Sequence, residues 1–154
     1  MAHASAETPG ALLRLHTFSR ILYKEAQYWL VGLTPEHYHL YQARRWSELH
    51  KFDASARHLR KYLACSNKPQ VRAELGWCLA VLGRWTEAVE EYEMATAQWP
   101  HTSLRLALAE AHLRSGNPQR GAAIVRELDV EGLALEGTSR QALADLKKEL
   151  GLVA

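Results

Sequence analysis

The feature that most constrains the fold is a pair of apolar stripes at helical spacing within residues 69–100. Gly83 separates the two stripes and Pro100 follows the second. The stripes consist of Leu75, Leu79 and Leu82, and of Ala88, Tyr92, Ala95 and Trp99. Side chains three, four or seven positions apart lie on one face of an α-helix, so each stripe predicts an amphipathic helix. Because glycine tolerates positive φ, Gly83 indicates a tight turn between two antiparallel helices.

Similar patterns lie on both sides of this stretch. Downstream, Gly116 follows Gly83 after 33 residues, with Leu108-Ala109, His112, Pro118, Gly121, Val125 and Leu128 around it. Upstream, a looser copy has Ala43, Trp46, Phe52, Ser55, Leu59 and Tyr62 before Pro69, with His50 and Ser55 where small residues are usual. The middle copy itself contains Leu75-Gly76, Leu79, Gly83, Trp85, Ala88, Tyr92, Ala95 and Pro100. With these three copies the chain resembles a small bacterial-type protein of the tetratricopeptide repeat family, whose period is about 34 residues.

This resemblance implies an all-α protein: a right-handed superhelix of antiparallel helix pairs, with an extra N-terminal helix and a C-terminal capping helix. The scarcity of Val, Ile and Thr runs also favours helices over strands. We expect a flexible tail (1–10), an amphipathic helix (11–33), three hairpins (34–68, 69–101 and 102–136) and a capping helix (137–154).

Several residues predict where helices begin. Thr34 and Pro35 are typical of an N-cap followed by the first helical position, so a helix is expected from Pro35 to about Leu49. We expect Asp53 and Thr86 to cap the second helices of their hairpins. Residues 129–137 contain two glycines and are the least regular stretch.

Charge is unevenly distributed along the chain. Residues 1–72 carry 11 lysines and arginines against 5 acidic residues, and residues 73–154 carry 8 against 12. This asymmetry would orient an acidic partner or favour head-to-tail association, although ordinary solvated helix faces explain it more simply. A basic patch for nucleic acid would consist of Arg44, Arg45, Arg57, Arg60 and Lys61. Because an acidic half dilutes these charges, we expect no nucleic-acid partner.

No motif in the sequence indicates catalysis, a cofactor or a metal site. Phosphate loops, nucleophile elbows and zinc patterns are absent, so the chain is not expected to be an enzyme. His37 and His39 are two positions apart and would point in different directions on a helix. Cys65 and Cys78 form no CxxC pair, which favours a reducing compartment. With no uninterrupted membrane span, we expect a cytoplasmic protein.

In tetratricopeptide arrays the first helix of each hairpin lines a concave surface. The resemblance therefore implies a partner-binding groove lined by Tyr41, Arg44, Glu74, Trp77, Val81, Leu106, Glu110 and Leu113, with Glu48 and Ala73 in the same row. Trp77 lies off the leucine stripe of its helix, so it is either a binding anchor or packs on a neighbouring helix.

The row also predicts the chemistry of the partner. Val81, Leu106 and Leu113 would make the floor partly apolar, which suits a helix or an extended peptide. The row lacks lysine and asparagine and carries Glu74 and Glu110, so we do not expect it to grip an acidic C-terminal carboxylate.

The leading hypothesis is a non-catalytic scaffold or adaptor that holds another protein or peptide in this groove. The size and layout also resemble type III secretion chaperones. A further alternative is self-association, in which the helix at 11–31 forms a homodimer surface or occupies its own groove.

Overall fold

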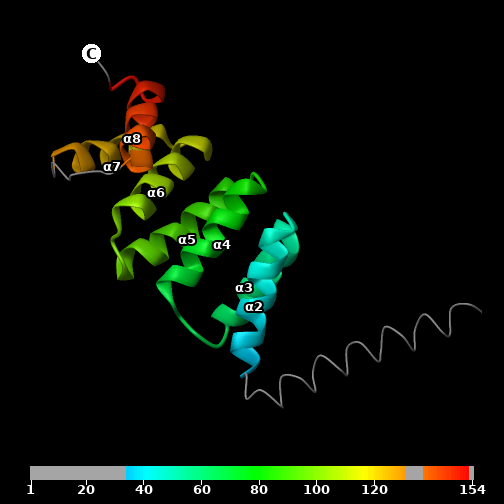
Figure 1. The fold of residues 1–154 in the computed structure, drawn as a ribbon. Helices are drawn as coiled ribbons and strands as arrows, with labels where there is room; N and C mark the ends of the chain where they lie inside the picture. Colours follow the sequence, from blue (N-terminus) through cyan, green and yellow to red (C-terminus); the bar gives the residue numbers. More distant parts are fainter. Residues whose placement is uncertain (1–33, 131–136, 153–154) are drawn as a thin grey trace, which may run out of the picture. The chain divides into compact units, whose positions relative to one another are not determined.

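The computed structural model describes residues 34–130 and 137–152, and these residues contain seven α-helices and no strand (Figure 1). In chain order the helices are α2 (Pro35–Glu48), α3 (Phe52–Leu63), α4 (Pro69–Val81), α5 (Trp85–Gln98), α6 (Thr102–Arg114), α7 (Pro118–Val130) and α8 (Gly137–Glu149). The expected all-α class is therefore confirmed. The expected tail and the helix at 11–33 lie outside the described residues. No described helix is both long enough and apolar enough to span a membrane.

The chain divides into two compact units, residues 1–38 and 39–154, and the packing below lies within the second unit. There, α4 packs on α3 and α5, α6 packs on α5 and α7, and α8 packs on both α6 and α7. Neighbours in sequence are thus neighbours in space, as stacked helical hairpins require. In the first unit, the backbone carbonyl of Thr34 accepts the N–H of Tyr38 at 3.2 Å, which places the start of α2 at Pro35 as expected.

Four helices end in the same left-handed turn, which is the clearest repeat in the backbone. α2, α4, α6 and α8 are each followed by a residue with φ between 56° and 88°, namely His50, Gly83, Gly116 and Gly151. The N–H of that residue bonds three positions back, and the next N–H bonds five positions back, as Arg84 does to Leu79 at 2.9 Å. These bonds satisfy carbonyls that the helix end leaves without partners.

The left-handed turn also explains why two predicted caps are wrong. After His50 and Gly83 the chain enters the next helix almost at once, so Lys51 and Arg84 occupy the N-cap positions without a side-chain cap bond. Asp53 and Thr86 instead lie inside the first turns of α3 and α5. An acidic side chain such as Asp53 is still favourable there, near the positive end of the helix dipole.

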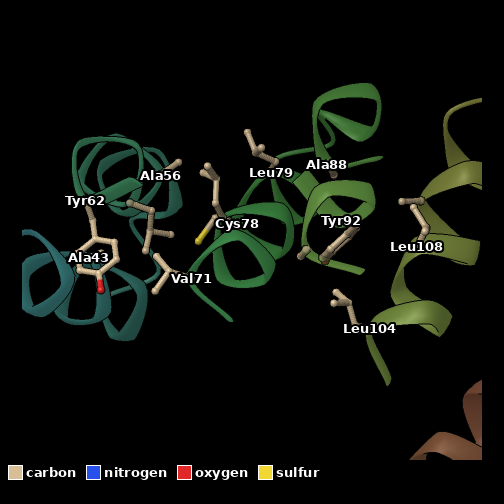
Figure 2. Packing of buried hydrophobic residues seen from close by; sticks show 14 residues of the cluster. Ala43, Ala56, Tyr62, Val71, Cys78, Leu79, Ala88, Tyr92, Leu104 and Leu108 are labelled. Carbon is tan, nitrogen blue, oxygen red and sulfur yellow. The ribbon is translucent and has the colours of Figure 1, made fainter. Parts of the chain in front are cut away.

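Two clusters of buried side chains hold the hairpins together. The first runs from α2 to α6 and includes Ala43, Leu59, Leu75, Leu79 and Tyr92 (Figure 2). The second joins α6, α7 and α8 through Leu106, Ala109, Val125, Leu128, Leu143 and Leu146. Most of the apolar stripe positions are therefore core positions, as their spacing predicts.

Some stripe residues lie elsewhere. Trp99 follows the last residue of α5, has 36% of its surface exposed, and stacks on His101 with ring centroids 4.9 Å apart. Leu82 follows the last residue of α4 and is only partly buried. The apolar periodicity thus continues past the helix ends in sequence, and at Trp99 the backbone is no longer helical, with φ −144° and ψ 82°.

Candidate functional site

The predicted groove residues of α2 and α4 form an exposed strip, which we call the α2–α4 strip: Tyr41, Arg44, Glu74, Trp77 and Val81. Tyr41 is 56% exposed, Trp77 is 47% exposed and Val81 is 49% exposed. Apolar side chains of this size with about half of their surface in water are candidates for a contact surface.

An ion pair joins the two helices within the strip. Arg44 donates from Nη2 to Glu74 Oε1 at 2.8 Å and from Nε to Oε2 at 3.5 Å. The hydrogen bond to Glu74 raises the pKa of Arg44. Because Glu74 is already paired, it does not present the free negative charge on which the sequence argument against carboxylate binding relied. The expectation that the row does not grip a carboxylate remains a prediction that rests on Glu110 and on the absence of lysine and asparagine.

Trp77 has a partner in the neighbouring hairpin. Its ring meets the ring of Phe52, at the start of α3, edge to face with centroids 5.2 Å apart. Phe52 in turn meets His50 with centroids 5.9 Å apart. Edge-to-face contact orients aromatic rings and holds them in place. Trp77 thus packs on a neighbouring helix, which is one of the two alternatives considered from the sequence, and 47% of its surface stays exposed.

The predicted residues of α6 have a different environment. Leu106 is only 5% exposed, since it belongs to the core cluster under α8. Glu110 is exposed and lines a groove of about 470 Å³ between α6 and α8, which we call the α6–α8 groove. Leu113 is half-buried and lines a separate hollow of about 310 Å³ with Leu150 and Leu152. Leu106 therefore reaches only the bottom of a groove, and Leu113 does not share that groove.

Sequence reasoning missed α8 as a wall of the site. It treated α8 only as a capping helix, although Thr138, Ser139, Ala142, Asp145 and Glu149 line the α6–α8 groove. The left-handed turn at Gly151, matching those at Gly83 and Gly116, is the signal that relates α8 to the first helices of the hairpins.

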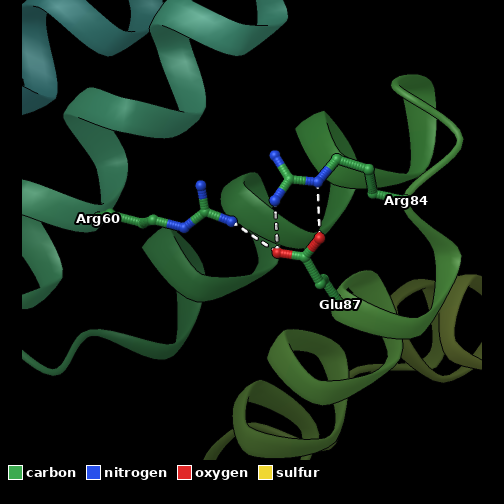
Figure 3. Close-up of polar contacts among 3 residues, drawn as sticks. All are labelled: Arg60, Arg84 and Glu87. Atoms are coloured by element: carbon green, nitrogen blue, oxygen red, sulfur yellow. Dashed lines mark hydrogen bonds and ion pairs between the residues drawn. The ribbon is translucent and has the colours of Figure 1, made fainter.

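Ion pairs within and between hairpins use many of the charges noted in the sequence. Glu87 accepts hydrogen bonds from Arg84 at 2.6 and 2.7 Å and from Arg60 of α3 at 3.0 Å (Figure 3). The Arg84 hydrogen bonds lower the pKa of Glu87. Arg72 pairs with Glu91 at 2.9 Å, with both side chains 18% exposed. The basic and acidic halves of the sequence therefore pair with each other, which reduces the charge available to an outside partner.

In the described part of the chain, no group of three or more histidine, cysteine, aspartate or glutamate side chains is placed to bind a metal ion. His39 and His58 lie with their Nδ1 atoms 3.1 Å apart. Burial lowers the pKa of both, and the positive charge of Lys61 lowers each further. Cys65 is exposed and Cys78 is buried, and both are free thiols. Burial raises the pKa of Cys78, whose Sγ donates to Ser55 Oγ at 3.5 Å.

Stacked helical hairpins with a repeated left-handed turn define a helical-repeat protein. A model of the tetratricopeptide repeat matches residues 42–102 and again residues 82–132, which together exceed half of the chain. The chain therefore belongs to the tetratricopeptide repeat family.

Among solved structures, MamA AMB-1 is similar to this chain, with a TM-score of 0.59 and 21% sequence identity. The match covers 84% of this chain and 66% of MamA AMB-1, so the chain spans just under two thirds of that protein. At this identity the likeness shows the fold. No curated protein matches the chain significantly.

Proposed function

We propose that this protein is a non-catalytic scaffold that binds a helix or an extended peptide of a partner protein along its first helices. Membership of the repeat family supports a protein-interaction role in general. The observation that carries the finer proposal is the α2–α4 strip, in which Tyr41, Trp77 and Val81 are about half exposed.

The residues of the strip are typical of a binding surface rather than of a hydrophobic core. Trp77 is pre-oriented by Phe52, so binding would cost little additional side-chain entropy. The Arg44–Glu74 pair beside it supplies polar groups at the edge of the apolar surface. Interfaces commonly combine a central aromatic residue with a polar rim.

Peptides selected from a random phage-displayed library against the full chain provide the test. Their dissociation constants would be measured with the parent protein, with Trp77→Ala and Val81→Ser, and with Trp99→Ala. Trp99 is the matched control, because it is an exposed tryptophan at the end of α5. We expect Trp77→Ala to weaken binding about tenfold or more and Trp99→Ala to change it little. Unchanged affinity in both strip variants would refute this assignment.

The dimer alternative depends on residues 11–33, which lie outside the described residues. Nothing in the described helices favours it, or the secretion-chaperone alternative, over a general scaffold.

A further inference from the structure

The α6–α8 groove has a lining of mixed character. Its apolar part comes from Leu106 and Ala107 of α6 and from Ala142 and Leu146 of α8. Its polar part comes from hydroxyl and charged side chains: Ser103, Glu110, Arg114, Thr138, Ser139, Asp145 and Glu149. At about 470 Å³ the groove lies within the size range of roughly 300–1,000 Å³ that is usual for ligand pockets. It is therefore large enough to hold a long side chain of a bound segment.

The charges that line this groove are predominantly negative. Three carboxylates, Glu110, Asp145 and Glu149, face a single guanidinium, Arg114. Arg114 lies 3.2 Å from Glu149 and 3.9 Å from Glu110, so its charge is shared between those two. Asp145 accepts a hydrogen bond from the neutral amide of Gln141 at 3.0 Å, which does not offset its charge.

The other lysines and arginines of α6 and α8 do not line the groove, and two of them have partners on α7. Lys147 of α8 pairs with Asp129 of α7, and Arg105 of α6 pairs with Glu127 of α7. Both pairs join α7 to its neighbours, and neither Lys147 nor Arg105 lines the α6–α8 groove. The groove thus retains an excess of two negative charges beside an apolar floor.

A lysine or arginine side chain complements both properties. Its aliphatic stem can lie along an apolar surface while its charged end remains close to water and to carboxylates. An acidic side chain would be repelled, and a purely aliphatic one would leave the carboxylates without a new partner. We propose that the α6–α8 groove binds a basic side chain, lysine or arginine, of the protein segment held by the scaffold. This inference rests on the proposed function and adds the chemistry of the partner to it.

The test uses two protein variants with the same change in net charge. Glu110→Gln with Asp145→Asn removes two groove carboxylates while keeping their size. Asp53→Asn with Glu90→Gln removes two exposed carboxylates elsewhere, on α3 and α5. The probes are the library-selected peptides, each compared with a version in which its basic residue is replaced by norleucine, which keeps the stem and removes the charge.

We expect selected peptides to contain lysine or arginine, and norleucine replacement to weaken their binding to the parent about fivefold, the upper end for a solvent-exposed ion pair. The groove variant should bind the basic peptide about fivefold more weakly than the parent does, and it should bind the basic and the norleucine peptides with equal affinity. The control variant should distinguish the two as the parent does. Equal affinity of both peptides for the parent, or an undiminished difference in the groove variant, would overturn the inference.

A second measurement separates failure of this inference from failure of the proposed function. N-acetyl-lysine methylamide and N-acetyl-norleucine methylamide would be titrated into labelled protein, following amide shifts of α6 and α8 by NMR. Shifts in these helices only with the lysine compound, lost in the groove variant, would support the basic site even if no library peptide binds. Peptide binding that depends on Trp77 but not on a basic residue would leave the scaffold proposal intact and overturn this one. Absence of lysine-specific shifts together with absence of a charge effect on peptides would also overturn it.

Discussion

At the scale of single residues, Gly76 of α4 lies at a close contact between two helices. A Cβ added there would lie 2.7 Å from two ring carbons of Tyr92 in α5. Tyr92 is 4% exposed and belongs to the first core cluster, so its ring has little room to move. The glycine that helped to identify the repeat is therefore required by packing.

Gly76→Ala should consequently destabilise the protein. In an exposed helix this change would be favourable by about 1 kcal/mol, since alanine is the better helix former. Here the clash with Tyr92 should outweigh that gain and produce a net loss of about 1–3 kcal/mol. Urea unfolding followed by circular dichroism would measure it. A variant more stable than the parent would show that α4 and α5 are not in this close contact.

The Arg72–Glu91 pair should contribute more than the exposed pairs, because it is largely shielded from water. Arg72 also donates to Asn67 Oδ1 at 2.7 Å, so its guanidinium is held between two partners. Glu91→Ala leaves a mostly buried cation with only the amide, and we expect a loss of about 1.5–3 kcal/mol. Glu90→Ala, at the adjacent exposed position, should change the free energy of unfolding by less than about 0.5 kcal/mol. Equal effects of the two substitutions in urea titrations would contradict the importance of the pair.

Individual side chains also show how far the sequence could predict the site. The stripes identified Leu75, Leu79 and Tyr92 as buried because spacing alone places them on the inner face of a helix. The position of Trp77 off its stripe predicted only that the hairpin core does not need it, and left open whether its ring is exposed or packs on a neighbouring helix. The burial of Leu106 depends on α8, whose packing is a tertiary contact that local spacing does not encode.

At the scale of elements, the left-handed turn is the feature that the sequence only partly revealed. Glycine marks it after α4, α6 and α8, and these three helix ends were predictable. After α2 the same conformation is adopted by His50 with φ 56°, which no glycine signals. The turn of the first hairpin therefore has the same backbone geometry as the others, but His50 adopts a left-handed conformation that is sterically disfavoured for a residue with a side chain.

Exchanging residue types at this turn should therefore have opposite effects. His50→Gly relieves the disfavoured conformation and is expected to stabilise the protein by up to about 1 kcal/mol. Gly83→Ala introduces that conformation at φ 74° and is expected to destabilise it by about 1–2 kcal/mol. Thermal unfolding of both variants against the parent would measure the effects. If His50→Gly melts earlier, then the ring contact of His50 with Phe52 outweighs the backbone strain.

The α2–α3 contact should also make stability depend on pH. Burial lowers the pKa of both His39 and His58 below the ordinary value of 6.5, and the positive charge of Lys61 lowers both further. His39 and Arg57 also lower the pKa of His58. The unfolded chain therefore takes up protons first as pH falls, so stability is complete above about pH 6.5 and declines as pH falls through the lower folded values. His112, whose pKa burial also lowers, adds to this decline.

Replacing both histidines of this pair should reduce that pH dependence. We expect the melting temperature of the parent to fall more between pH 7.5 and pH 5.5 than that of His39→Gln with His58→Gln. His101→Gln removes an exposed histidine and is the control, expected to behave like the parent. If the double variant loses as much stability on acidification as the parent, then this pair is not a source of the pH dependence.

At the scale of the whole molecule, we expect the free energy of unfolding to differ from one hairpin to the next. Within residues 39–154, each hairpin packs mainly on its neighbours, and the two core clusters meet at α6. Repeat arrays of this kind behave as a sum of local units and their interfaces. The second cluster depends on α8, since Leu143 and Leu146 complete the burial of Leu106 and Leu128.

Leu146→Ala is therefore expected to loosen one end of the array selectively. Leu146 is 7% exposed, and truncating a core leucine costs about 2–5 kcal/mol. Amide hydrogen exchange should rise in α7 and α8, and in the part of α6 that faces them, while α4 and α5 keep most of their protection. Ala144→Ser, at an exposed position of α8, is the control and should leave exchange unchanged. An equal loss of protection in α4 and α5 would show that the described helices unfold as one cooperative unit, and the α6–α8 groove would then share the stability of the α2–α4 strip.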